Sequence, residues 1–119
     1  MKMRRLISAI IALMLVVNLS VTALAAEWYL ENGDITISAG ENGQTVSQGG
    51  GAAVEDNAPV IKGSSTENTV TINAEKDRTA NVTIEGVNID VSGAGKAAVS
   101  TTGEGNVNIE LNGSNALKS

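Results

Sequence analysis

The sequence predicts an all-β protein wound as a parallel β-helix, and three observations support that prediction. Several short stretches, such as 69–72 and 106–111, alternate β-branched residues with polar ones, which is typical of strands with one buried face. Glycine and asparagine lie between these stretches at a density that disfavours helices. Inward strand positions recur at intervals of 23–25 residues, as at Ile37, Ile61, Ile84 and Ile109, a period typical of a solenoid whose coils rest on one another.

Residues 1–25 are a predicted secretory signal peptide. Three basic residues precede an apolar run at 6–17, and Ala23-Leu24-Ala25 supplies the small-x-small cleavage motif. The alternative is a transmembrane anchor, but an anchor needs about 20 apolar residues and this run is shorter. We therefore expect cleavage between Ala25 and Ala26 and a secreted or cell-surface protein.

The segment after the leader, residues 26–119, is acidic and lacks several catalytic residue types. It has 5 basic and 13 acidic residues, a net charge of −8, which argues against nucleic acid as a partner. The chain has no cysteine and no histidine. This composition excludes disulfide scaffolds, thiol nucleophiles, serine–histidine triads and histidine metal sites, so we expect no enzyme activity.

A column of isoleucines sets the predicted register of the coils. Ile37, Ile61, Ile84 and Ile109 follow one another at nearly even spacing, and we expect them to stack as successive rungs of one sheet. On this register residues 35–119 hold about three and a half coils. The alternative is an antiparallel sandwich in which this spacing is fortuitous.

Residues 26–34 are the predicted cap of the first coil. Asn32-Gly33 is a strong hairpin signal, and it would fold Trp28-Tyr29-Leu30 back over the strand that follows. Terminal coils of solenoids need such a cover. The alternative is that Trp28 and Tyr29 form a platform on which a sugar ring stacks. The C-terminal coil has no such cap, and we expect its edge to be open.

The repeat texture carries a family resemblance over nearly all of residues 26–119. The start at 28–37 and the coils at 81–86 and 106–113 resemble secreted surface proteins with pectate-lyase-like right-handed parallel β-helices. More narrowly, the chain resembles the clostridial "carbohydrate-binding domain-containing" surface proteins. The resemblance implies a non-catalytic β-helix that binds acidic plant polysaccharide, often with calcium. Members of this group are usually several times longer, which implies that this chain is an N-terminal piece.

Two acidic residues are the candidates for a metal site. In the predicted register Glu85 and Glu110 share an outward column with Lys62. The simpler interpretation is a solvated ladder of charges in which Lys62 neutralises one neighbour. The alternative is a weak calcium site, because calcium prefers oxygen ligands.

The sequence therefore leaves two classes of function. The first is a non-catalytic carbohydrate-binding β-helix, which at a net charge of −8 would need a divalent cation to hold an acidic polysaccharide. The second is a structural surface solenoid, such as an adhesin stalk, with no glycan ligand. Its open edge would receive further β-helix coils or stack on another copy.

Overall fold

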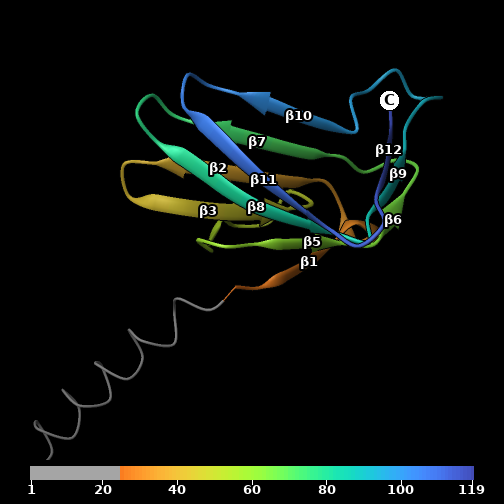
Figure 1. The fold of residues 1–119 in the computed structure, drawn as a ribbon, viewed down its shortest axis with the longest axis horizontal. Helices are drawn as coiled ribbons and strands as arrows, with labels where there is room; N and C mark the ends of the chain where they lie inside the picture. The colour runs from red at the N-terminus through yellow and green to blue at the C-terminus, as the bar shows by residue number, and fades with distance from the viewer. Residues whose placement is uncertain (1–24) are drawn as a thin grey trace, which may run out of the picture.

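The computed structural model describes residues 25–119, which form an all-β structure of three open sheets with one short 3-10 helix. Figure 1 shows the strands running across the molecule in two broad sheets, with a narrow third sheet at one side. Within residues 25–119, no helix is long and apolar enough to cross a membrane. The predicted leader, apart from Ala25, lies outside the described residues.

Sheet A is entirely parallel. Its strands are β1 (Glu27–Tyr29), β5 (Val60–Lys62), β8 (Thr79–Glu85) and β11 (Asn106–Asn112), in the order β1-β5-β8-β11. Alternate side chains of β8 are buried, which is the pattern expected for a strand with one face on a core.

Sheet B is mixed, and its order is β10-β7-β2-β3-β4. The strands are β10 (Val99–Thr102), β7 (Val70–Ala74), β2 (Ile35–Gly40), β3 (Gly43–Gln48) and β4 (Val54–Glu55). The first three are parallel to one another. The last two are antiparallel additions, because β3 folds back on β2 and β4 folds back on β3.

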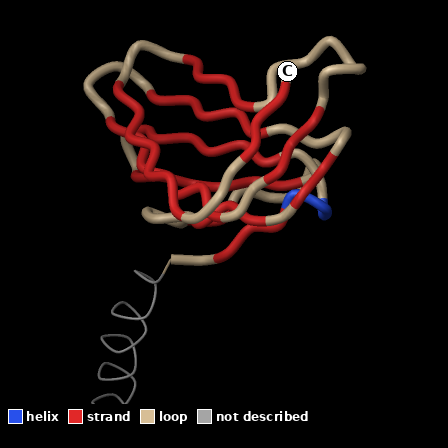
Figure 2. The backbone as a smooth tube through the Cα atoms, turned by 45° about the vertical axis from the view of Figure 1, so that its right-hand side comes forward, coloured by secondary structure: helices blue, strands red, loops and turns tan. Residues whose placement is uncertain are grey.

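Sheet C is short and parallel, in the order β12-β9-β6. Its strands are β6 (Ser64–Ser65), β9 (Asn88–Asp90) and β12 (Ala116–Lys118). From β5 onward the chain adds one strand to sheet A, one to sheet C and one to sheet B, and then repeats that order. The 3-10 helix η1 (Leu30–Asn32) packs beside β6, and Figure 2 shows it as the single blue segment.

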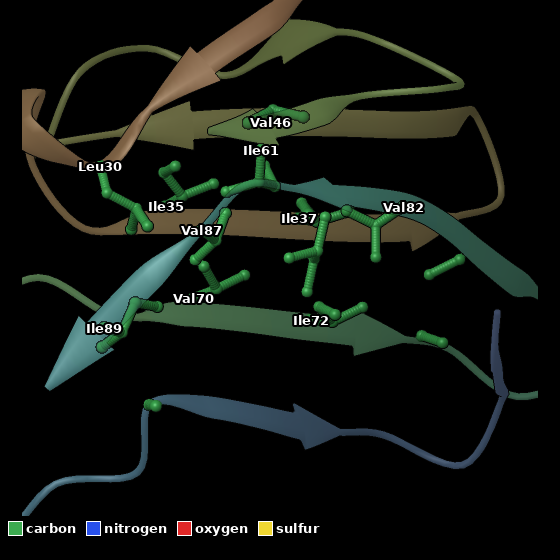
Figure 3. Packing of buried hydrophobic residues seen from close by; sticks show 14 of the residues in the cluster. Leu30, Ile35, Ile37, Val46, Ile61, Val70, Ile72, Val82, Val87 and Ile89 are labelled. Carbon is green, nitrogen blue, oxygen red and sulfur yellow. The ribbon is translucent and has the colours of Figure 1, made fainter. Parts of the chain in front are cut away.

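The core lies between the three sheets and is aliphatic. Figure 3 shows side chains from β2, β5, β7, β8 and β9 pointing toward one another in this interior. Valine and isoleucine at every second strand position supply most of it. The largest fully buried apolar side chains are Leu30, Ile35, Ile37, Val46, Ile61, Val70, Ile72, Ile84, Val87, Ile89 and Val91.

The predicted isoleucine column is correct for one step and wrong for the others. Ile61 and Ile84 are direct partners in sheet A. Ile37 lies in sheet B, where its parallel partner is Ile72. Ile109 lies in sheet A but faces Val82, so it is two residues out of the predicted register with Ile84.

Loops of unequal length explain this error. The segment with β3 and β4 lies between β2 and β5, so the interval from Ile37 to Ile61 includes an excursion in sheet B. In sheet A the step along the chain from Ile61 to its partner Ile84 is shorter than the step from Ile84 to its next partner, Leu111. A constant period therefore cannot align all the strands of this chain.

The predicted N-terminal hairpin is also wrong. β1 and β2 belong to different sheets, and β1 pairs in parallel with β5 instead. Residues Leu30–Asn32 form η1 rather than the end of a hairpin strand, and Gly33 follows with a φ of 133°. The hairpin that does form is β2–β3, joined at Glu41 and Asn42.

Candidate functional site

The two aromatic side chains do not form a shared platform. Trp28 is half-buried against the core, and its Nε1 donates a hydrogen bond of 2.8 Å to Asp56 Oδ2. Tyr29 is exposed and its hydroxyl donates to Glu27 Oε2. Because neighbouring residues of a strand point to opposite faces, the indole and the phenol lie on opposite sides of β1. This geometry favours a structural role for Trp28 over sugar stacking.

The two candidate metal ligands are not register partners. Glu85 faces Asn112 across β8 and β11, whereas Glu110 faces Thr83. Lys62 Nζ lies 3.3 Å from Glu85 Oε2 and 3.2 Å from Glu27 Oε1. In residues 25–119, no three acidic, histidine or cysteine side chains cluster closely enough to hold a metal ion. The calcium site proposed for Glu85 and Glu110 therefore has no geometric support.

The Lys62 ion pairs are a solvent-facing network. Hydrogen bonds to Glu27 and Glu85 raise the pKa of Lys62 above its ordinary value. Hydrogen bonds from Tyr29 and Lys62 lower the pKa of Glu27. All of these groups are exposed to water, so the network adds little to stability. Lys62 thus pairs with Glu85, as the predicted ladder of charges requires. Its second partner is Glu27 on the β1 side, and Asn112 faces Glu85 where Glu110 was expected.

A more distinctive feature is the edge that β11 presents. Val107, Ile109 and Leu111 pair with Ala80, Val82 and Ile84, so their side chains point to the inner face of sheet A. Nevertheless Ile109 is 41% exposed and Leu111 is 62% exposed. Leu117 of β12 is 43% exposed, although its partner Ile89 is fully buried. The last layer of strands therefore presents core-type side chains to solvent.

The backbone of β11 also has free hydrogen-bonding groups. The Asn106 N–H donates to the Arg78 carbonyl, and the Asn112 carbonyl accepts from the Gly86 N–H. Since alternate residues of a parallel strand bond to the same neighbour, the even-numbered residues of β11 face β8. The N–H and C=O groups of the odd-numbered residues at 107, 109 and 111 face away, and no strand of residues 25–119 pairs with that side.

At the opposite end of the stack the core is covered, and β1 and β4 are the edge strands. Leu30 and Val46 are fully buried there, and β3 and β4 extend sheet B beyond β2. β5 pairs with only the end of β8, which leaves Asn81 beside no strand on that side. The buried Gln44 fills this place: its Nε2 donates to the Asn81 carbonyl at 2.8 Å, and its Oε1 accepts from the Asn81 N–H at 2.9 Å.

A shallow groove of about 660 Å³ crosses the three strands of sheet C. Ser64, Asn88 and Ala116 lie side by side in register, and Asp90 and Lys118 form the next pair. The hydroxyl and backbone N–H of Ser92 hydrogen-bond to Asp90 and lower its pKa, so that carboxylate stays charged in mildly acidic solution. The remaining lining residues, Ser65 and Thr66, add further polar groups.

Sequence reasoning missed Gln44 and Asp56, which are the two buried polar side chains of the described chain. Gln44 did leave a signal: it lies two residues before Val46, so both side chains point to the same inner face of a strand with few apolar residues. Asp56 left none, since it lies in a loop between two short strands.

No protein-family model, no curated protein and no solved structure matches this chain.

Proposed function

We propose that this chain is a secreted, non-catalytic structural module, a right-handed parallel β-helix that associates with a second copy through β11. The recurring addition of strands to sheets A, C and B supports the β-helix, because each new strand lies parallel to the previous one in its sheet. The strong preference of parallel crossovers for the right hand supports the handedness.

The observation that carries this proposal is the exposed edge of β11. An unpaired strand edge with inward-facing apolar side chains attracts another strand. Carbohydrate binding through Trp28 and Tyr29 lacks comparable support, because the indole is hydrogen-bonded and packed against the core.

The sequence of β11 favours a second copy as the occupant of this edge. In an antiparallel pair centred on Ile109, Ile109 faces its own copy and Val107 faces Leu111 of the other chain. Each of these is a pair of residues whose free N–H and C=O groups point outward, so each pair can exchange two hydrogen bonds. On the outer face Asn108 of one copy faces Glu110 of the other. The two Glu110 carboxylates therefore lie on diagonal positions, about 7–8 Å apart.

The covered end favours a closed dimer over a filament. Head-to-tail stacking would require β11 to add beside β1 and β10 to add beside β4. β4 is an antiparallel strand, and the parallel strands that recur from β5 onward have no equivalent of it. A two-fold pair instead joins identical edges and leaves the covered ends outward.

Sedimentation velocity of the full chain, produced in a secreting host, tests the dimer. We expect a monomer–dimer equilibrium at micromolar concentrations. Ile109→Lys should weaken it by about tenfold or more, because it sets two ammonium groups against each other. Leu117→Lys is the matched control, since Leu117 is equally exposed but lies off the seam. A monomer at all concentrations, species larger than a dimer, or an equal loss with the control contradicts the proposal.

Cross-linking tests the register. The chain has no cysteine, so Ile109→Cys introduces a single thiol at the two-fold axis. Hydrogen-bonded partners have Cα atoms about 5.5 Å apart, which lies within disulfide range. We expect mild oxidation to convert Ile109→Cys to a covalent dimer and to leave Val54→Cys, at the covered end, as a monomer. Equal cross-linking of both variants would mean non-specific contact.

The groove of sheet C favours a second candidate function, binding of an extended glycan. Strands in a sheet are about 4.8 Å apart, close to the length of one sugar unit, so a chain crossing β6, β9 and β12 would meet a polar side chain on each strand: Ser64, Asn88 and Lys118. With a net charge of −8 after the leader and a charged Asp90 in the groove, a neutral polysaccharide fits better than an acidic one.

Retention on insoluble polysaccharides tests this second candidate. Binding to neutral polysaccharide in the presence of a chelator, reduced by Asn88→Ala but not by Asn108→Ala on sheet A, would support it. Binding to a polyuronate that disappears with the chelator would support the acidic ligand and calcium implied by the family resemblance. No retention on either material would leave the structural role alone.

A further inference from the structure

Asp56 is a buried carboxylate whose hydrogen-bond donors are all neutral in the intact chain. It is 2% exposed and lies between β4 and β5. Its Oδ2 accepts from Trp28 Nε1 at 2.8 Å and from the Ala26 nitrogen at 3.2 Å, and its Oδ1 accepts from the Ala58 N–H at 3.1 Å. Both ion pairs of residues 25–119 belong to Lys62 instead.

A buried carboxylate without a cation is unfavourable, because neutral donors replace only part of its hydration. The three donors come from the residue before β1, from β1 itself and from the loop before β5. Asp56 therefore connects β1 to the loop that leads into β5. The missing element at this junction is a positive charge close to Oδ2.

The chemistry of one peptide bond would supply that charge. Hydrolysis between Ala25 and Ala26, at the small-x-small motif, consumes one water and leaves a carboxylate on Ala25 and an ammonium group on Ala26. The nitrogen that becomes charged is the one already 3.2 Å from Asp56 Oδ2. Its position is set by the strand ladder, because the Ala26 carbonyl accepts from the Val60 N–H at 2.9 Å.

We infer that processing after Ala25 creates an ion pair between the new α-ammonium group of Ala26 and buried Asp56, which locks the first strand layer. The precursor has only an amide hydrogen bond at this place, whereas the processed protein has a charge-assisted one. Removal of the leader thus stabilises the protein by converting the Ala26 nitrogen from an amide to an ammonium group. The inference is independent of dimer formation and of glycan binding.

The first test is the N-terminus itself. Mass spectrometry of the protein secreted from the full chain should give Ala26 as its first residue. A protein that begins elsewhere, or that keeps its leader, overturns the inference, because the ammonium group would then be absent or displaced.

The second test removes the charge without changing the sequence. Selective acetylation of the α-amino group restores an amide at Ala26, and the acetyl carbon takes the place of the exposed Ala25. We expect acetylation to raise the unfolding equilibrium constant in urea by about threefold to tenfold, the range between exposed and buried ion pairs. No change on acetylation overturns the inference.

Asp56→Asn identifies the partner of the new charge. In this variant acetylation should change the unfolding constant by less than about twofold, because the partner charge is gone. Asp34→Asn is the matched control: Asp34 also accepts a backbone N–H, from Thr69, but it is exposed and makes no bond to Ala26. Its response to acetylation should equal that of the unmodified sequence. If Asp56→Asn does not fold, the inference is tested by comparing acetylated and free protein. Equal unfolding constants overturn it, and a loss on acetylation that Asp34→Asn does not reduce supports it.

Discussion

β8 and β11 are adjacent strands of equal length with the same alternation of polar and apolar residues, yet one is buried and the other is exposed. β8 reads Thr79–Glu85 and has alternate residues in the core. β11 reads Asn106–Asn112, lies in full register with β8, and has no fully buried residue. The pattern of a strand therefore specifies which face turns inward, whereas burial depends on having neighbours on both sides.

The covered end shows how a protein supplies such a neighbour when a strand is too short. β5 reaches only part of β8, and the side chain of Gln44 provides one donor and one acceptor to Asn81 in place of the missing backbone. No equivalent side chain of the described residues serves the free side of β11.

The largest contrast is expected between two partners in the same register, Ile84 and Leu111. Ile84 is 1% exposed, so Ile84→Ala should lower the free energy of unfolding by about 2–5 kcal/mol through lost burial and an unfilled cavity. Leu111→Ala should lower it by less than about 0.5 kcal/mol in dilute, monomeric protein. Urea denaturation measures both values.

Similar losses at these two positions would contradict the difference in burial. Because small domains are only marginally stable, Ile84→Ala could abolish folding altogether. Ile84→Val then serves in its place, with an expected loss of about 0.5–1.5 kcal/mol.

The next prediction concerns the covered edge. Gln44→Leu keeps a buried side chain of similar size but leaves the Asn81 N–H and carbonyl without partners. An unsatisfied buried group costs about 1–3 kcal/mol, and these two groups are partly buried, so we expect a loss of about 1–3 kcal/mol in total. Amide hydrogen exchange at Asn81 should accelerate by more than the global loss of stability requires. Unchanged exchange at Asn81 would mean that water replaces the amide without penalty.

A smaller effect is expected at the turn between β10 and β11. Gly103 has a φ of 88°, and a Cβ there would overlap the carbonyl oxygen of Ala74 at the end of β7. Gly103→Ala should therefore cost about 1–3 kcal/mol. Gly95→Ala is the control, because Gly95 also has a positive φ but has open space around it. The thermal midpoint should fall more for Gly103→Ala than for Gly95→Ala.

The elements of this fold differ in how far the sequence could predict them. The alternation at 34–37, 69–72, 81–84 and 106–111 correctly indicated strands, because burial of one face leaves that pattern. The pairing partners of each strand were harder to predict, because the register between strands depends on loop lengths that vary along the chain. β3 leaves only a weak pattern, because Val46 is its one buried apolar residue and Gln44 takes the other inward position.

The candidate site was predicted less well than the strands, for a related reason. Glu85 and Glu110 were assigned to one column by a constant period, and the longer loop before β10 shifts β11 by two residues relative to it. Trp28 was correctly placed at the first layer, but its contact with Asp56 joins two positions that are distant in the sequence. Such pairs leave no local signal in a sequence.

The smallest expected effect is the pH dependence that Asp90 contributes at the surface. The hydroxyl and N–H of Ser92 lower the pKa of Asp90, so its contribution to stability is present above the ordinary aspartate value and is lost as pH falls through the lowered one. Asp90 is partly exposed and water screens the interaction, so the urea midpoint should fall only slightly from this group as the pH drops below about 4. Ser92→Ala should flatten that part of the curve, because it removes the 2.6 Å hydroxyl hydrogen bond that is the largest cause of the shift. An unchanged curve would mean that the backbone N–H alone holds the carboxylate in its charged form.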